Sequence, residues 1–347
     1  MDYSIITKKK EYIRNKINSI IRDIDTSKYW ITLSKSELSD IVFAGGDGSY
    51  NKRNYTNYCL YVVGSVSYIN KVGGKIGESL SLWDVDIILP YSQVSNRLRL
   101  YMTNLELKTT LWNFINKDID YYLFDGSLYS LIIQTHTYNA NGFLKGEFDK
   151  YKDELLNKIY SQIESGEICP TVDYGNDLKN RFLFEQLEYI VLLTEIFKKY
   201  GDKFIGISKT SKMSLYFSEY NIPDMGIFQN NIKNKGYSKP LNLCDKSIKD
   251  INKNVYDAIN NFRYYYDLKD LYYQFVRLED GNKPVLCITS LKELDEEILS
   301  SLSSISVGGY PYILKKSHDM VKIKDSDMER CAKILGIYDK IDRDEVL

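Results

Sequence analysis

The sequence predicts one α/β domain that carries a helical insertion in its middle. Short runs rich in β-branched and aromatic residues, the pattern of strands, occur in residues 41–135 and return in residues 201–291. Between them, residues 140–200 are richer in charge and in helical spacing. A chain of 347 residues is long enough for one large domain with an inserted layer. We therefore expect a single domain over residues 1–347.

Residues 1–40 are expected to form an N-terminal helical segment. Apolar residues recur at helical spacing from residue 4 to residue 25, among them Ile6, Ile13 and Ile17. The lysines near the start are not followed by an apolar h-region, so the segment lacks the pattern of a secretory signal. The prediction is an amphipathic helix.

Residues 41–135 are expected to form the first part of the core. The predicted elements are a short strand over 41–47, a strand over 58–68, two strand-like pieces in 75–89, a helix over 96–116 with Ser95 as its N-cap, and an apolar run over 119–124. The order of the strands predicts an antiparallel meander of three or more strands, followed by a helix.

Residues 201–347 are expected to form the second part of the core and the C-terminal helices, after the helical insertion at 140–200. The predicted elements are a strand over 203–207, strands over 271–278 and 284–291, a helix opened by Gly308-Gly309-Tyr310-Pro311, and a last amphipathic helix after Asp325. The chain contains no internal repeat and no low-complexity linker.

Composition limits the partners and the location. The chain contains no run of about 18 apolar residues, which argues against a membrane span. Its five cysteines are scattered without CxxC spacing, which favours a reducing, cytoplasmic location and argues against a zinc site. The formal net charge is −1, so a polyanion must be held by local Lys and Arg residues or by bound metal. The 31 tyrosines are interpreted as composition bias rather than as a base-stacking surface.

The stretch FAGGDGSY at residues 43–50 allows two interpretations. Backbone amides of a GGDG turn cradle a phosphate in some nucleotide-binding kinases, where a helix follows the turn. The residues that follow here have no helical periodicity and lead to a strand, so this alternative is disfavoured. The second interpretation makes Asp47 a metal ligand.

A second copy of the same tripeptide supports the metal interpretation. Asp47-Gly48-Ser49 and Asp125-Gly126-Ser127 each follow an apolar, strand-like run. Two aspartates at neighbouring strand ends can share a divalent ion, and Mg²⁺ or Mn²⁺ accepts such oxygen ligands. The alternative is that both are turn aspartates that accept hydrogen bonds from local amides.

Two further residues have suitable positions. Glu106 lies beside the buried stripe of the predicted helix and can extend over the strand ends, although a solvated helix glutamate is the alternative. His318 lies on the same predicted helix face as Leu314 and Val321, among several lysines. It is either a metal ligand or a satisfied core histidine.

The DGS copies, Glu106 with Asp125 nineteen positions later, GISKTSK at 206–212 and the closing YPYILKKSHDMVKI together resemble the NurA nuclease family. The resemblance covers residues 43–323. It implies an RNase H-like mixed sheet flanked by helices, and a metal-dependent DNase with 5′-to-3′ exonuclease and single-strand endonuclease activity. It also implies a ring-like homodimer that works with the hexameric HerA ATPase on single-stranded DNA and duplex ends in double-strand-break repair.

The resemblance also implies roles for individual residues. Asp47, Glu106, Asp125 and His318 would bind the metal, expected as two Mn²⁺ or Mg²⁺ ions, with Mn²⁺ favoured because imidazole suits it better. The remaining candidates for DNA contact are Lys52 and Arg53, in an expected loop, and Lys209 and Lys212 of SKTSK, of which Lys209 would lie on the scissile phosphate. Asp224 falls where the family often has an acidic residue. The competing function is a non-catalytic partner that docks DNA or an ATPase.

Overall fold

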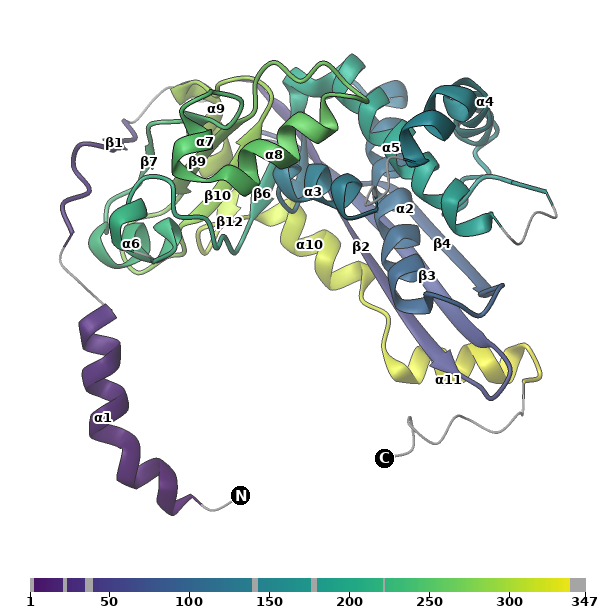
Figure 1. The fold of residues 1–347 in the computed structure, drawn as a ribbon, viewed down its shortest axis with the longest axis horizontal. Helices are drawn as coiled ribbons and strands as arrows, with labels where there is room; N and C mark the ends of the chain where they lie inside the picture. Colours follow the sequence, from purple (N-terminus) through teal and green to yellow (C-terminus); the bar gives the residue numbers. More distant parts are fainter. Residues whose placement is uncertain are drawn as a thin grey trace.

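A computed structural model describes residues 3–20, 24–34, 40–138, 143–175, 180–220 and 222–337. Its centre is a 10-stranded sheet ordered β1-β7-β9-β10-β6-β5-β2-β3-β4, with β8 paired to β9 (Figure 1). The strands of this sheet are β1 (Trp30–Thr32), β2 (Val42–Asn54), β3 (Cys59–Lys71), β4 (Ile76–Ile87), β5 (Tyr121–Asp125), β6 (Phe204–Ser208), β7 (Gly236–Ser238), β8 (Leu241–Asn242), β9 (Tyr272–Arg277) and β10 (Leu286–Ser290). A separate two-stranded sheet pairs β11 (Ser306–Val307) with β12 (Tyr310–Pro311).

The sheet has the predicted RNase H-like arrangement. Strands β2, β3 and β4 form an antiparallel meander, and β5 and β6 follow on the other side of β2, parallel to it. Of the remaining large strands, β10 is antiparallel to β6, and β9 is antiparallel to β10. The expected mixed α/β sheet is therefore confirmed.

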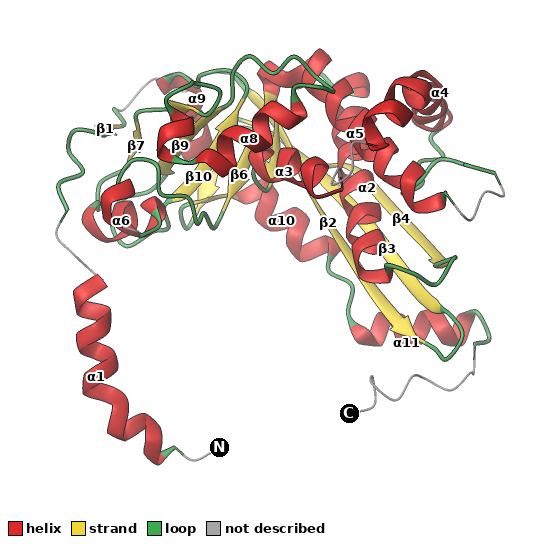
Figure 2. Ribbon diagram, in the orientation of Figure 1, coloured by secondary structure: helices red, strands yellow, loops and turns green. Residues whose placement is uncertain are grey.

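Helices cover both faces of this sheet (Figure 2). The α-helices of the described structure are α1 (Ser4–Ile20), which stands away from the sheet, α2 (Val94–Asn116), α3 (Leu128–Tyr138), α4 (Phe143–Ser165), α5 (Arg181–Tyr200), α6 (Asp224–Asn231), α7 (Ile248–Ile251), α8 (Lys253–Phe262), α9 (Glu296–Ser304), α10 (Tyr312–Val321) and α11 (Asp325–Ile334). In the described part of the chain, no helix combines the length and the apolar character that a membrane span requires.

Alternation along the central strands divides the core in two. Ala44 and Phe124 face one core, which α2, α3, α4, α5 and α8 complete. Phe43 and Leu123 face the other core, which α9 and α10 complete. Because successive strand residues point to opposite faces, each central strand is buried on both sides.

Three element predictions need correction. The strand predicted for 41–47 continues to Asn54, because β3 pairs with β2 along its whole length. The two pieces predicted in 75–89 are one strand, β4, with a register shift opposite Ser67 and Tyr68. The N-cap of α2 is Gln93 rather than Ser95, which lies inside the helix. The helix predicted for residues 4–25 is confirmed to Ile20, and residues 21–23 lie outside the described part.

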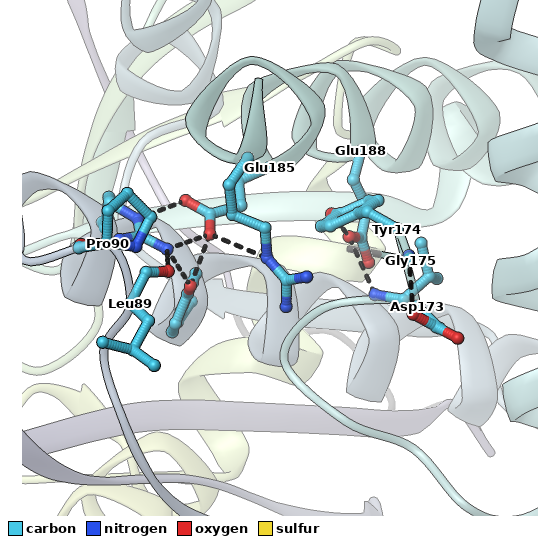
Figure 3. A network of polar contacts seen from close by, with 11 residues as sticks. Leu89, Pro90, Asp173, Tyr174, Gly175, Glu185 and Glu188 are labelled. Atoms are coloured by element: carbon cyan, nitrogen blue, oxygen red, sulfur yellow. Dashed lines mark hydrogen bonds and ion pairs between the residues drawn. The ribbon is translucent and has the colours of Figure 1, made fainter. Parts of the chain in front are cut away.

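A buried ion pair joins α2 to α5. The Arg97 guanidinium donates through Nε to Glu185 Oε2 at 2.8 Å and through Nη2 to Glu185 Oε1 at 2.6 Å. Its side chain is 1% exposed, and that of Glu185 is fully buried. The remaining donors reach the carbonyl oxygens of Leu89 and Pro90, and Tyr101 donates to Glu185 (Figure 3). The charges are thus paired and hydrogen-bonded, the condition under which buried charges are tolerated.

A second buried pair lies further along the same two helices. Lys108 Nζ is 2.6 Å from Glu188 Oε1 and donates to Gln162 Oε1 and to the Cys169 carbonyl, both at 2.7 Å. Tyr174 donates to the other oxygen of Glu188, as Figure 3 shows. Lys108 therefore ties α2 to α4, to α5 and to the loop between them. Buried charged residues thus hold the helical layer to the core.

Candidate metal centre

The register of β2 and β5 brings Asp47 and Asp125 side by side. Gly46 is the partner of Phe124 in the parallel pairing, and the two numbers differ by 78 (124 minus 46). Asp47 and Asp125 differ by the same 78 (125 minus 47), so they are the next residues along both strands. The two DGS tripeptides therefore lie at the same position along two neighbouring strands.

Glycines let helices approach β2 closely at this level. A Cβ on Gly45 would lie 3.0 Å from Leu314 of α10, and a Cβ on Gly48 would lie 2.6 Å from Cγ of Glu106 in α2. The two contacts are on opposite faces of the strand, because successive strand residues point to opposite faces and Gly45 and Gly48 are an odd number of residues apart. The glycines of the GGDG stretch thus serve close packing by two helices.

This geometry excludes the phosphate cradle. GGDG lies within β2, and the residues after it continue the same strand to Asn54. Amides of a strand interior are used in the sheet ladder, and no helix N-terminus follows them. The kinase-like alternative is therefore wrong at the level of local structure.

His318 completes a cluster with the two aspartates. Its Nδ1 lies 2.7 Å from Oδ2 of Asp47. One ligand atom each from Asp47, Asp125 and His318 lies within 4.8 Å of the other two. The expectation that His318 shares the buried face of α10 with Leu314 and Val321 is wrong, because its side chain is 57% exposed. It lies at the edge of that face and points toward Asp47.

Glu106 reaches the same level from the opposite side of β2. It is 7% exposed, and it is not one of the three residues whose ligand atoms cluster within 4.8 Å. Burial raises its pKa well above the usual range, and repulsion from Asp47 and then Asp125 raises it further. Burial and the charge of Asp125 also raise the pKa of Asp47, although His318 opposes this. The carboxyl groups of Asp47, Glu106 and Asp125 therefore repel one another, and this arrangement is unfavourable without a cation.

We expect the metal-free protein to lose stability as pH rises, because of Glu106. In the unfolded chain its pKa is about 4.3. Between that value and the raised value in the folded state, the native protein binds more protons, so the free energy of unfolding falls with increasing pH. Glu106→Gln should remove this loss, worth about 1.4 kcal/mol for each unit by which the pKa is raised. Urea unfolding in chelator from pH 4 to pH 8 measures it.

The exposed Glu164 offers a matched control for this measurement. Glu164→Gln should leave the pH dependence unchanged. A Glu106→Gln profile parallel to that of the unsubstituted chain would show that Glu106 is not the group responsible. Adding Mn²⁺ should restore stability at neutral pH only where Glu106 is retained.

Lys209 and Tyr310 border the cluster. Lys209 Nζ is 2.9 Å from Asp125 Oδ2 and lies 4.5 Å from the centre of the Tyr310 ring. Burial raises the pKa of Tyr310, and the charges of Asp125 and Asp47 raise it further. The position of Tyr310 beside the cluster was not predicted, although Gly308-Gly309-Tyr310-Pro311 was predicted to open helix α10. Its position eight residues before His318 was the available signal.

The other basic candidates lie elsewhere. Lys52 and Arg53 lie in β2 rather than in a loop, so their expected loop location is wrong. Their side chains point to opposite faces of the strand. Lys52 Nζ lies 3.5 Å from Ser95 Oγ of α2, and Arg53 is near enough to Glu329 of α11 for its charge to lower the pKa of that carboxyl group. Lys212 is exposed in the loop after β6.

Asp224 is not part of the cluster. It is fully buried at the start of α6, and its carboxylate accepts hydrogen bonds from the backbone amides of Leu215, Tyr216 and Phe217. Burial raises its pKa to about 6, against these amides, which lower it. Its contacts fix the loop between β6 and α6.

The donor set fits a divalent transition metal. Carboxylate oxygens with one imidazole nitrogen suit Mn²⁺ well, whereas Mg²⁺ prefers oxygen ligands alone. Burial is the largest cause of the raised pKa values of Asp47 and Glu106, and the repulsion between neighbouring carboxylates, which such an ion would relieve, adds to it. The residues present therefore fit a manganese site.

Comparisons with known proteins agree with this fold. A family model described as the NurA domain matches residues 41–323. A curated relative from Methanocaldococcus jannaschii, named "Probable DNA double-strand break repair nuclease NurA", is 40% identical over 343 residues, 94% of this chain and 86% of the relative. A relative from Sulfurisphaera tokodaii, named "DNA double-strand break repair nuclease NurA", is 30% identical over 256 residues, 74% of this chain and 69% of the relative.

Solved structures share the architecture. The crystal structure of the NurA nuclease from Sulfolobus solfataricus has a TM-score of 0.70 at 24% identity, covering 96% of this chain and 95% of that chain. A crystal structure of NurA bound to dAMP and manganese has a TM-score of 0.62 at 14% identity, covering 98% and 94%. At these sequence identities, the structural similarity supports the fold alone.

Proposed function

Because this chain belongs to the NurA family, we propose that it is a metal-dependent deoxyribonuclease that processes DNA at double-strand breaks. One observation carries the proposal: Asp47, Asp125 and His318 converge within 4.8 Å, from strands and a helix far apart in sequence. Curated relatives are named DNA double-strand break repair nucleases, and a similar structure is titled with dAMP and manganese. The expected activities are 5′-to-3′ exonuclease and single-strand endonuclease.

Asp47 and Asp125 are proposed as the central metal ligands, with His318 and Glu106 completing the set. Bound divalent ions, expected as two Mn²⁺ or Mg²⁺, activate water and neutralise charge on the scissile phosphate. The fold places the proposed ligands around the ions. β2 and β5 hold the two aspartates at one level, α10 directs His318, and α2 brings Glu106 across Gly48.

Lys209 is proposed to stabilise the charge that develops on the phosphate during cleavage. Its ammonium lies 2.9 Å from Asp125, so it borders the space where the phosphate would bind. We expect Lys209→Met to lower kcat about 100-fold with a smaller change in KM, because an aligned cation acts mainly on the transition state. Steady-state kinetics on a labelled single-stranded oligonucleotide measures both constants.

Lys203, exposed just before β6, provides the matched control. Lys203→Met should leave kcat unchanged. If Lys209→Met changed KM alone, Lys209 would be a binding residue without a role in the transition state.

The wider assembly follows from family membership. We propose a homodimer acting with a HerA-type hexameric ATPase in the cytoplasm, on single-stranded DNA and duplex ends. Lys209 and Lys212 lie on the β6 side of the site, and Lys52 lies about 17 Å along β2 from Asp47, so these lysines would contact separate backbone phosphates. Arg53 shares the sheet face of Asp47 and would contact DNA there, whereas Lys52 would contact it from the opposite face.

An end-labelled cleavage assay tests the activity. Single-stranded and duplex substrates are incubated with Mn²⁺, Mg²⁺ or chelator. Cleavage with Mn²⁺ and none with chelator supports the proposal, and product length against time separates exonuclease from endonuclease action. Absence of cleavage under every condition would leave a non-catalytic docking role instead.

A further inference from the structure

Helix α10 carries two lysines on the same side as His318. Lys315 precedes His318 by three residues and Lys322 follows it by four, so the three side chains lie within about 60° of one another around the helix. Lys322 caps the helix, and its φ of −62° keeps its Cβ where a further helical residue would place it. Both lysines are exposed, as is His318. One side of α10 therefore presents an ammonium group on each side of the imidazole.

This side of α10 borders the metal site because the helix lies beside β2 (Figure 1). His318 Nδ1 lies 2.7 Å from Asp47 Oδ2. Four residues further along β2, the side-chain amide of Asn51 donates to the carbonyl oxygen of Ile323 at 3.4 Å. The helix and the strand thus run in the same direction. Because His318 reaches the cluster from this side, the two lysines lie about one helical turn before and after it.

Neither lysine is neutralised by the chain itself. Among the described residues, Lys315 and Lys322 form no ion pair. Asp319, the one acidic residue of α10, is exposed and is likewise not in an ion pair. Lys316 differs from both lysines, because it is half-buried and its Nζ lies 4.5 Å from the centre of the Tyr68 ring. Two ammonium groups beside the site are therefore available to an anion from outside the chain.

The spacing of the two lysines suits a DNA backbone that crosses the site. Lys315 and Lys322 are separated by about 10 Å along the helix axis. The flexible four-carbon stem of each lysine lets its ammonium adjust to a nearby phosphate. A phosphate bound at the cluster would have its neighbours on the same strand within reach of Lys315 on one side and of Lys322 on the other.

We propose that Lys315 and Lys322 bind the backbone phosphates that flank the scissile phosphate, so that α10 aligns a single DNA strand with the metal site. This role rests on the nuclease activity proposed above and names residues that position its substrate. Such backbone contacts fix the position of a strand without reading its sequence. The flanking phosphates keep their charge during cleavage, so these lysines act on binding, whereas Lys209 acts on the reacting phosphate.

Binding of a labelled single-stranded oligonucleotide in chelator, followed by fluorescence anisotropy over a salt series, tests the contacts apart from cleavage. For a single strand, each phosphate contact contributes about 0.7 to the decrease of log K with log salt concentration. Lys315→Met and Lys322→Met should each raise the dissociation constant and reduce this slope by about 0.7. Lys316→Met makes the same change at the lysine that packs on Tyr68, and it should leave the slope unchanged. Circular dichroism of each variant establishes that it is folded.

Steady-state cleavage with Mn²⁺ gives a second readout. Lys315→Met and Lys322→Met should each raise KM about tenfold with a smaller change in kcat, because binding that is equal in the ground state and the transition state changes KM alone. An unchanged salt slope in either variant, or an equal change in Lys316→Met, would overturn the proposal while leaving the nuclease activity in place. Absence of cleavage by the unsubstituted chain would reject the nuclease and this role together.

A neutral methylphosphonate at one position of the oligonucleotide locates each contact. With the unsubstituted chain, it should slow cleavage at the neighbouring bond on both sides. Lys315→Met should abolish the effect on one side, and Lys322→Met should abolish it on the other. An equal effect on both sides in all three proteins would mean that neither lysine binds a flanking phosphate.

Discussion

Replacing Asp47 by asparagine is expected to abolish Mn²⁺-dependent cleavage of DNA while the fold is retained. Asp47 is the residue that contacts His318 and stands beside Asp125, so its loss removes the shared ligand of the cluster. Charge stabilisation by a bound metal is worth several kcal/mol. A loss of about 4 kcal/mol corresponds to a decrease in rate of about 1,000-fold. Single-turnover cleavage of a labelled oligonucleotide measures the decrease.

Binding of Mn²⁺, followed by calorimetry, should weaken in parallel with cleavage in Asp47→Asn. The melting temperature in chelator should stay the same or rise, because the substitution removes repulsion that raises the pKa of both Asp47 and Glu106. Asp118→Asn, at an exposed position before β5, is the matched control. Full cleavage activity in Asp47→Asn would show that cleavage does not require Asp47 as a metal ligand.

Breaking the buried pair between α2 and α5 should be the most destabilising single change. Glu185→Leu leaves the Arg97 guanidinium buried without its carboxylate, which is expected to lower the free energy of unfolding by about 3–5 kcal/mol. Removing both charges, as Arg97→Met with Glu185→Leu, should recover most of this loss, because a hydrophobic pair of similar volume leaves no unpaired charge. Guanidinium unfolding of the three proteins measures the difference.

The surface pair of Lys158 and Glu154, both exposed and four residues apart on α4, serves as a control for this comparison. Glu154→Leu should change the free energy of unfolding by less than about 1 kcal/mol. An equally small effect of Glu185→Leu would mean that water or a rearranged side chain satisfies Arg97. A double variant less stable than Glu185→Leu would indicate that the carbonyl oxygens of Leu89 and Pro90 depend on the guanidinium.

The sequence indicated the strands of the proposed metal site because their signal is local. Each DGS tripeptide follows its own apolar run, and a strand followed by Asp-Gly is recognisable without tertiary information. The register that brings Asp47 beside Asp125 was not predictable from this, since it depends on pairing between segments 78 positions apart. Glu106 and His318 were candidates from their positions on predicted helices, but their geometry depends on the placement of α2 and α10 on opposite faces of β2.

The errors share a physical cause. Lys52 and Arg53 were assigned to a loop because polar residues disfavour a strand locally, yet pairing with β3 extends the strand through both. Arg97 and Glu185 are 88 positions apart, so nothing near either residue in sequence shows that the other will neutralise it. At Lys52 and Arg53 a tertiary partner overrode local preference, and at Arg97 and Glu185 no local pattern predicted the pairing.

The contact between His318 and Asp47 joins residues 271 positions apart. A ribosome delivers the chain from its N-terminus, so Asp47, Glu106 and Asp125 are present long before α10 is made. A growing polypeptide therefore holds three acidic groups without their imidazole until α10 has been made. If His318 acts as proposed, a nascent chain that lacks α10 would be unable to cut DNA.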